Sequence, residues 1–199
     1  MLELSTKMKS FREKLHRFEV LIMNIKIVPG LNNSGPEHWQ TIWEKKYGFE
    51  RIAQEEWDYP VYKEWEKNLI ESLSRENSCD VVLIAHSLGC LLTVKAMPKI
   101  RKYLKAVFLV APPDPNKEQF PNFLDSFEHL PEANLELPGI LVYSENDQYS
   151  SSLFCIEKAK QWGIETMSVG RKGHINSESN IGDWSEGFNL FQKLLERIQ

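Results

Sequence analysis

The sequence predicts a three-layer α/β domain, in which helices cover both faces of a mostly parallel sheet of five or six strands. Two observations lead to this prediction. From residue 24 onward, short β-branched runs alternate with longer amphipathic stretches, which is typical of strands that alternate with helices. Two of the runs, 81–85 and 106–110, are apolar at every position. Strands have that pattern when helices cover them on both sides, as in parallel sheets built from right-handed βαβ units.

Each element follows from its own pattern. We expect strands at the β-branched runs 25–28, 81–85, 106–110, 140–143 and 165–169, with a weaker candidate at 51–53. We expect helices at the amphipathic stretches 37–47, 61–74, 88–97, 151–162 and 184–198. Residues 112–138 hold six of the ten prolines and interrupt the alternation. They predict an irregular excursion over the sheet edge. It could border a substrate pocket, but we favour a passive loop.

The N-terminal stretch has a helical pattern of its own. Apolar residues from Leu4 to Ile22 recur every three or four positions and share one helical face. We therefore divide the chain into an N-terminal amphipathic helical extension, residues 1–22, and a single α/β domain, residues 23–199. We expect the extension to dock on the domain or on a second copy, so that a homo-oligomer can form through it.

Composition indicates which classes of partner and which cellular compartment to expect. The formal net charge is −4, without a basic stripe, so we expect no nucleic acid partner. No apolar run approaches the roughly 18 residues of a membrane span. The N-terminus is charged and lacks the pattern of a secretory signal. The three cysteines show no C-x-x-C spacing, which argues against a disulfide framework or a zinc site and favours a cytoplasmic location.

The most informative run is Ala85-His86-Ser87-Leu88-Gly89. A predicted strand precedes it and a predicted helix follows, as in the nucleophile elbow G-x-S-x-G, here with alanine in the first place. The serine of such an elbow sits on a strained turn, so its neighbours two positions away must be small. The Leu88 amide lies at the helix N-terminus, where it can stabilise an oxyanion. The plain alternative for Ser87 is a helix N-cap.

A serine nucleophile needs a base and an acid that orients the base. His174 follows the last predicted strand and is the expected base; His129, the other candidate, lies in the proline-rich excursion. Asp147 follows the strand 140–143 and is the expected acid, because catalytic groups collect at the carboxyl ends of strands in open sheets. Asp114 follows the preceding strand and stays an alternative, whereas Glu145 is too close to its strand.

The second oxyanion donor is expected in the loop after the first strand. Residues 29–35 are rich in glycine and asparagine, and the backbone N–H of Leu31 would face Ser87 if both loops lie at the same sheet edge. The loop lacks the glycine spacing of the nucleotide-binding motifs.

Several short motifs together carry a resemblance to a known family. They are Pro29-Gly30-Leu31-Asn32, His38-Trp39, Trp57-Asp58-Tyr59-Pro60, Trp65, Ala85-His86-Ser87-Leu88-Gly89, Ser144-Glu145-Asn146-Asp147, Gly173-His174-Ile175-Asn176 and Gly182-Asp183-Trp184. Over roughly residues 23–198 the chain resembles the YdeN / retinoblastoma-binding-protein-9 group of α/β-hydrolase-fold serine hydrolases. The resemblance implies a three-layer fold with little or no lid, and a triad of Ser87, Asp147 and His174. It also implies hydrolysis of small ester- or amide-like acyl substrates without a metal or an organic cofactor.

Two other functions remain open from the sequence. The first is a catalytically weak or inactive protein of the same fold that acts as a protein-interaction module. The order of the three chemical roles along the chain argues against it. The second is acyl transfer through the same acyl-enzyme.

Residues 153–157 also match L-x-C-x-E, a motif that binds retinoblastoma-type pockets in extended form. Because they fall in a predicted helix whose Leu153 and Ile156 should face the core, we interpret the match as coincidence.

Overall fold

A computed structural model describes residues 24–76 and 79–199 as a three-layer α/β fold. Its six strands form one sheet in the order β2-β1-β3-β4-β5-β6, and every neighbouring pair is parallel. The strands are β1 (Ile25–Val28), β2 (Glu50–Arg51), β3 (Val81–His86), β4 (Leu104–Val110), β5 (Gly139–Tyr143) and β6 (Glu165–Ser168). The helices are α2 (Trp39–Tyr47), α3 (Tyr62–Ser74), α4 (Leu88–Ile100), α5 (Ser152–Trp162) and α6 (Ser185–Ile198), with short 3₁₀ turns η1 (Arg101–Tyr103), η2 (Asn122–Phe127) and η3 (Ser177–Ser179).

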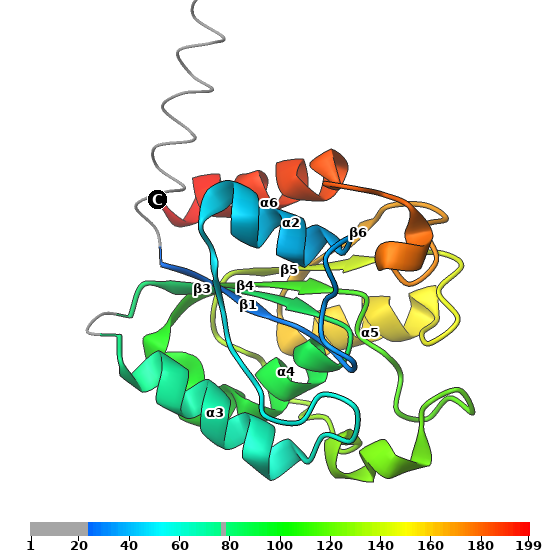
Figure 1. The fold of residues 1–199 in the computed structure, drawn as a ribbon, viewed down its shortest axis with the longest axis horizontal. Helices are drawn as coiled ribbons and strands as arrows, with labels where there is room; N and C mark the ends of the chain where they lie inside the picture. The colour runs from blue at the N-terminus through cyan, green and yellow to red at the C-terminus, as the bar shows by residue number, and fades with distance from the viewer. Residues whose placement is uncertain (1–23, 77–78) are drawn as a thin grey trace, which may run out of the picture.

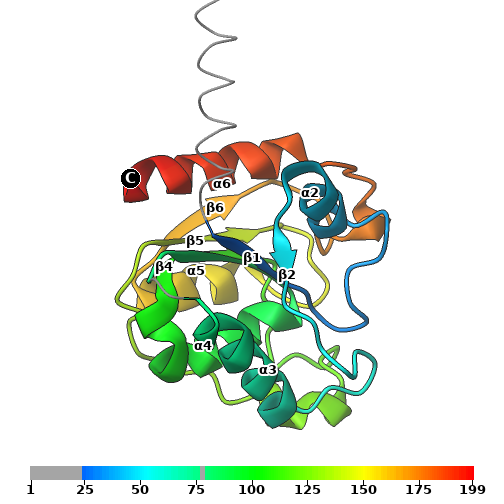
Figure 2. The ribbon, with the colours of Figure 1, turned by 60° about the vertical axis from the view of Figure 1, so that its left-hand side comes forward.

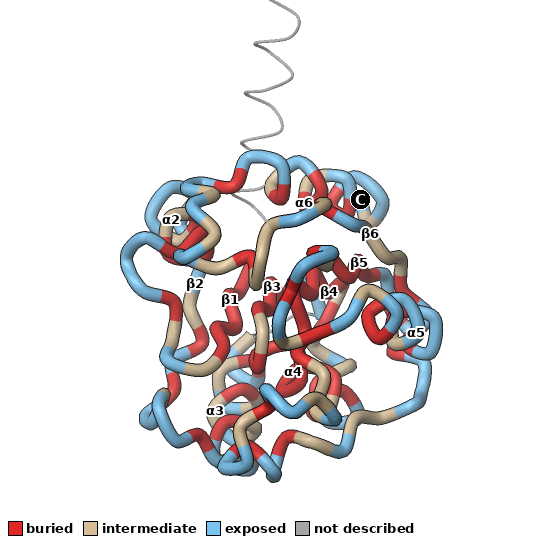
Figure 3. Tube along the Cα trace, turned by 90° about the vertical axis from the view of Figure 1, so that its right-hand side faces the viewer, coloured by how far each residue is buried: buried red, intermediate tan, exposed pale blue. Residues whose placement is uncertain are grey.

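The helices divide between the two faces of the sheet. Helices α2 and α6 cover one face, and α3, α4 and α5 cover the other (Figures 1 and 2). Each layer has its own apolar core, one built with Trp39, Trp43 and Phe191 and the other with Trp65, Leu91 and many further side chains. The central strands are buried along their length (Figure 3). The predicted fold class is therefore confirmed, and the continuous apolar runs are buried for the reason expected.

The ends of the elements differ from the prediction by a few residues. The largest difference is at α4, which we expected to end at Met97. Proline cannot donate a helical hydrogen bond. The helix continues to Ile100, with Pro98 in its last turn. Ile100 is fully buried, so packing of this last turn outweighs the loss of one backbone bond.

The prediction that Leu153 and Ile156 face the core is wrong. Their exposed fractions are 65% and 45%. Helix α5 instead turns Phe154, Cys155 and Trp162 toward the sheet. Large aromatic groups bury more apolar area than the aliphatic pair would, and they determine which face of the helix is inside.

Two further predictions concern the N-terminal extension and membrane spans. The N-terminal extension, residues 1–22, lies outside the described residues. Within residues 24–76 and 79–199, no helix is long and apolar enough to cross a membrane.

The close packing of α4 against β1 gives a first prediction. A Cβ added at Gly89 would lie 2.4 Å from the Val28 carbonyl oxygen and 2.6 Å from that of Pro29. Alanine favours helices over glycine by about 1 kcal/mol, but a backbone clash of this kind costs about 1–3 kcal/mol or more. We therefore expect Gly89→Ala to lower the free energy of unfolding in urea, with loss of activity as β1 shifts. Gly35→Ala is the matched control, since nothing lies within 4 Å of its added Cβ. Equal stability of the two variants would contradict the packing argument.

Candidate active site

Ser87 occupies a sharp turn between β3 and α4. Its φ is 52° and its ψ is −125°, a region that a residue with a side chain adopts only under strain of about 1–3 kcal/mol. Backbone hydrogen bonds hold the turn: the Ser87 N–H donates to the Val110 carbonyl at 2.9 Å, and its own carbonyl accepts from Cys90 N–H at 2.8 Å. The strained turn leaves the Ser87 side chain partly exposed, whereas the strand before it and the helix after it are buried.

His174 lies between Ser87 and Asp147. Its Nε2 is 2.8 Å from the Ser87 Oγ, and its Nδ1 is 2.8 Å from Oδ2 and 3.0 Å from Oδ1 of Asp147. A carboxylate only accepts hydrogen bonds, so Nδ1 carries the proton and Nε2 is free to accept from the serine hydroxyl. The Asp147 side chain is 2% exposed and that of His174 9% exposed, so water screens this chain of hydrogen bonds weakly. The structure thus brings together the three residues that the sequence analysis singled out.

The two competing carboxylates make other contacts. Asp114 Oδ1 accepts from the backbone and side chain of Asn116, which is a local turn. Glu145 accepts from Ser168. In the described part of the chain neither carboxylate hydrogen-bonds to a histidine. His129 is exposed in the proline-rich excursion, as a surface histidine would be.

The loops that carry Asp147 and His174 are tied to each other. Asn146 Oδ1 accepts from the Gly173 N–H at 2.9 Å, and the Ser144 hydroxyl accepts from the Lys172 N–H at 2.8 Å. The Tyr149 N–H donates to Asp147 Oδ1 at 2.9 Å. The acid and the base are therefore fixed relative to one another by backbone donors that belong to both loops, which is how a preorganised site keeps its geometry.

Residues that sequence reasoning missed support the His174 loop from the other side. The Trp39 indole N–H donates to the Ile175 carbonyl at 2.8 Å, and His86 Nε2 is 3.0 Å from the His174 carbonyl. The Tyr149 ring lies edge-on against the imidazole, with centroids 4.7 Å apart. The His38-Trp39 pair and the histidine before Ser87 were visible as motifs, but nothing in the sequence indicated that they meet.

The loop after β1 approaches the nucleophile closely. A Cβ added at Gly30 would lie 2.8 Å from the Ser87 Cβ, so only glycine fits there. The buried Gln40 side chain donates to the carbonyls of Val28 and Ile84 and so fixes the point at which the loop leaves β1. The N–H groups of Leu31 and Leu88 both belong to residues that line the cavity. Neither N–H donates to any other described residue, so both are available to an oxyanion.

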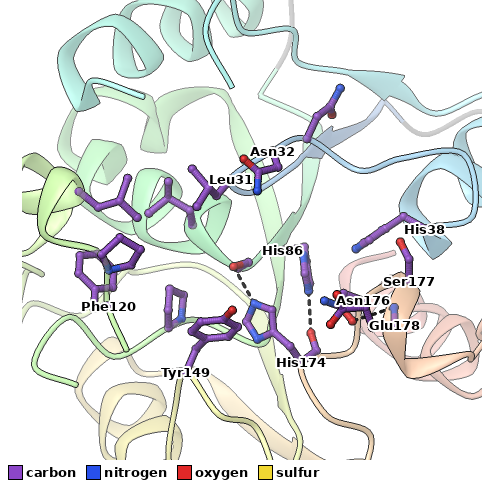
Figure 4. Close-up of a pocket in the computed structure, with 16 residues that line it drawn as sticks. Leu31, Asn32, His38, His86, Phe120, Tyr149, His174, Asn176, Ser177 and Glu178 are labelled. Carbon is purple, nitrogen blue, oxygen red and sulfur yellow. Dashed lines mark hydrogen bonds between the residues drawn. The ribbon is translucent and has the colours of Figure 1, made fainter. Parts of the chain in front are cut away.

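These residues line a cavity of about 360 Å³, within the range of small-molecule sites. One wall is apolar and the other is polar. The apolar wall holds Leu31, Leu88, Pro113, Phe120, Pro121 and Leu124. The polar wall holds Asn32, Asn33, His38, His86, Asn176, Ser177 and Glu178. Figure 4 shows Leu31 and Phe120 on one side of His174, and His38, Ser177 and Glu178 on the other.

The proline-rich excursion borders this cavity. Phe120, Pro121 and Leu124 of the apolar wall come from it, and Phe120 and Leu124 are buried. Of the two interpretations of residues 112–138, the passive loop is therefore wrong and the pocket border is right. As for metals, no group of three or more histidine, cysteine or acidic side chains within the described ranges is arranged so that it could hold a metal ion.

The fold and the strand-turn-helix position of Ser87 define a protein of the α/β-hydrolase fold. The family model described as serine hydrolase matches residues 25–193. The chain therefore belongs to the serine hydrolase family, as the resemblance implied.

Solved structures agree with this assignment. A YdeN-like hydrolase from Pectobacterium atrosepticum is 30% identical, with 93% of this chain and 97% of that chain covered and a TM-score of 0.82. The ydeN gene product of B. subtilis is 18% identical, covering 86% and 98%, with a TM-score of 0.72, and shows likeness of fold alone. An N-formylmaleamic acid deformylase from Pseudomonas putida S16 is 16% identical, covering 84% and 90%, with a TM-score of 0.63, and shares the fold alone. Among curated proteins no match was found.

Proposed function

We propose that this serine hydrolase cleaves small ester- or amide-like acyl substrates through an acyl-enzyme, with Ser87 as nucleophile, His174 as base and Asp147 as supporting acid. The observation that carries the proposal is the unbroken chain of hydrogen bonds from Ser87 Oγ through His174 to Asp147, with both links at 2.8 Å. It ends at a hydroxyl that a strained turn presents to a cavity.

Acylation follows from this arrangement. The Ser87 oxygen attacks the substrate carbonyl carbon while its proton passes to His174 Nε2. The carbonyl electron pair moves onto oxygen, and the N–H groups of Leu31 and Leu88 stabilise the resulting oxyanion. Asp147 stabilises the imidazolium by accepting from Nδ1–H. Collapse of the intermediate breaks the bond to the leaving alcohol or amine, which takes the proton from Nε2.

Deacylation repeats these steps with water. Water gives a proton to His174 Nε2 and attacks the acyl carbon, and the same two amides stabilise the second oxyanion. When this intermediate collapses, the bond to Ser87 breaks and the serine oxygen recovers its proton from the imidazolium. The products are the free acid and the original enzyme. An alcohol in place of water would give acyl transfer by the same route.

The size of the cavity predicts the length of the acyl group. The cavity of about 360 Å³ lies near the lower end of small-molecule sites, and Phe120 and Leu124 of its apolar wall are packed into the core. We therefore expect kcat/KM for p-nitrophenyl esters to be highest for acetate and butyrate and to fall for octanoate and laurate. If the steady rate is preceded by a burst that releases about one mole of nitrophenol per mole of enzyme, an acyl-enzyme accumulates. Failure to hydrolyse any ester or amide of the series would contradict the proposed function, and a maximum at laurate would contradict the size argument.

A further inference from the structure

Two buried histidines on the polar wall take no part in the proposed reaction. His38 comes from the residue before α2, and His86 ends β3 beside Ser87. Their exposed fractions are 4% and 5%, and their ring centroids lie 4.7 Å apart. Both residues line the cavity, and in Figure 4 the His38 side chain extends toward His86. A pair of buried polar rings beside the nucleophile calls for a hydrogen-bonding explanation.

The hydrogen bonds of His38 determine which nitrogen carries its proton. Nδ1 accepts from the Gln40 N–H at 3.1 Å and so caps α2. Burial, reinforced by the nearby charge of Arg51, lowers the pKa of His38 to about 3, so the ring is neutral at physiological pH and its proton is on Nε2. Nε2 is buried and has no hydrogen-bond partner among the described residues. The ring therefore offers an unsatisfied donor, which is costly unless something accepts from it.

In the His86 ring the unsatisfied group is an acceptor instead of a donor. Its Nε2 lies 3.0 Å from the His174 carbonyl oxygen, and a carbonyl only accepts, so Nε2 carries the proton. Burial holds the pKa of His86 well below its usual value, and the ring is neutral. Its Nδ1 is consequently a bare acceptor, and no other described residue donates to it. The two rings, with centroids 4.7 Å apart, thus carry one donor and one acceptor that no described residue satisfies.

We propose that this histidine pair binds a hydroxyl group of the substrate. A hydroxyl oxygen accepts from His38 Nε2–H while its proton is donated to His86 Nδ1, which satisfies both groups at once. The His86 ring lies 5.1 Å from the His174 ring, so the hydroxyl belongs to a part of the substrate close to the reacting carbonyl. This inference rests on the proposed function and narrows its substrate class.

The two walls decide which part of the substrate carries the hydroxyl. The apolar wall suits a short acyl chain. Asn176, Ser177 and Glu178 of the polar wall follow His174 closely along the chain, and the Nε2 of His174 protonates the leaving oxygen in the proposed reaction. The hydroxyl therefore lies on the leaving group. The substrate class is a short-chain ester of a polyol such as glycerol, in which a neighbouring carbon of the alcohol bears a free hydroxyl.

The test compares two esters that differ in those hydroxyls. Monobutyrin and propyl butyrate have the same acyl group and the same three-carbon alcohol skeleton. We expect the wild type to show a higher kcat/KM for monobutyrin. In His38→Asn, asparagine keeps a side chain that caps α2 but removes the Nε2–H donor. The ratio of the two kcat/KM values should fall about three- to tenfold, the effect of one lost hydrogen bond. His129→Asn, at the exposed histidine, should leave the ratio unchanged.

Labelling of the wild type with a fluorophosphonate separates failure of this inference from failure of the proposed function. If Ser87 is labelled but the wild type does not prefer monobutyrin, or His38→Asn keeps the preference, the pair holds only a structural water and the inference is overturned. If Ser87 is not labelled, the proposed function itself has failed. Should His38→Asn not fold, inhibition of the wild type decides: glycerol should compete with butyrate esters better than propanol does, and equal inhibition overturns the inference.

Discussion

Replacing Ser87 with alanine should lower kcat/KM for p-nitrophenyl butyrate by about 10⁴-fold or more, the loss typical of serine triads. The substitution removes the one oxygen among the described residues that hydrogen-bonds to His174 Nε2, at 2.8 Å, and leaves both oxyanion amides in place. The backbone at this position is strained with either residue, so the stability should change little. The measurement is ester hydrolysis, with urea unfolding to verify the fold.

The control for Ser87→Ala is Ser185→Ala, at an exposed serine at the start of α6. That variant should hydrolyse the ester at the wild-type rate. Because members of a triad act as a unit, His174→Ala should lose about as much activity as Ser87→Ala, and the double variant should lose little more. Additive losses, or a Ser87→Ala variant that keeps most of its activity, would contradict the assigned roles.

Asp147→Asn has the second largest expected effect, a fall in kcat of about 10⁴-fold. An asparagine amide has nearly the shape of the carboxylate, but it cannot stabilise the imidazolium. It also places an N–H near His174 Nδ1, which favours the tautomer in which Nε2 carries the proton and cannot accept from Ser87. Steady-state hydrolysis of p-nitrophenyl butyrate measures the loss, and an unchanged unfolding midpoint shows that it is chemical.

Asp114→Asn decides between the two candidate acids. The Asp114 side chain accepts hydrogen bonds from Asn116 alone among the contacts described, and asparagine can keep that turn. We expect this variant to stay active. If Asp114→Asn were inactive and Asp147→Asn active, the acid would follow β4 instead of β5, and the hydrogen bond between Asp147 and His174 would be structural.

The fold could be predicted well because burial and backbone sterics leave a mark on each short segment of the sequence. The continuous apolar run of β3 predicted a strand covered on both faces, and the small residues Ala85 and Gly89 predicted the elbow. The clash that a Cβ at Gly89 would meet is the steric reason for that pattern. His174 and Asp147 were predicted from their places after strands, because parallel strands deliver their carboxyl ends to one edge of the sheet.

Contacts between distant segments could not be predicted in this way. The sequence left Asp114 open as the acid, because the direction of a side chain in a loop depends on bonds such as those of Asn146 with the His174 loop. The supporting role of Trp39 depends on a contact with Ile175, 136 residues away. For α5, periodicity alone assigned Leu153 and Ile156 to the wrong face, since the pattern did not weigh the larger Phe154 and Trp162. The polar wall and its two histidines likewise exist only in the folded chain.

Mass-spectrometric mapping of a fluorophosphonate adduct tests the central claim most directly. The reagent forms a stable bond only with a serine whose hydroxyl is activated by a neighbouring base, so the claim predicts one adduct, on the peptide that contains Ser87. The adduct should be absent in Ser87→Ala and strongly reduced in His174→Ala. An adduct on any other serine, or labelling that persists without His174, would mean that this hydroxyl and this imidazole are not a catalytic pair.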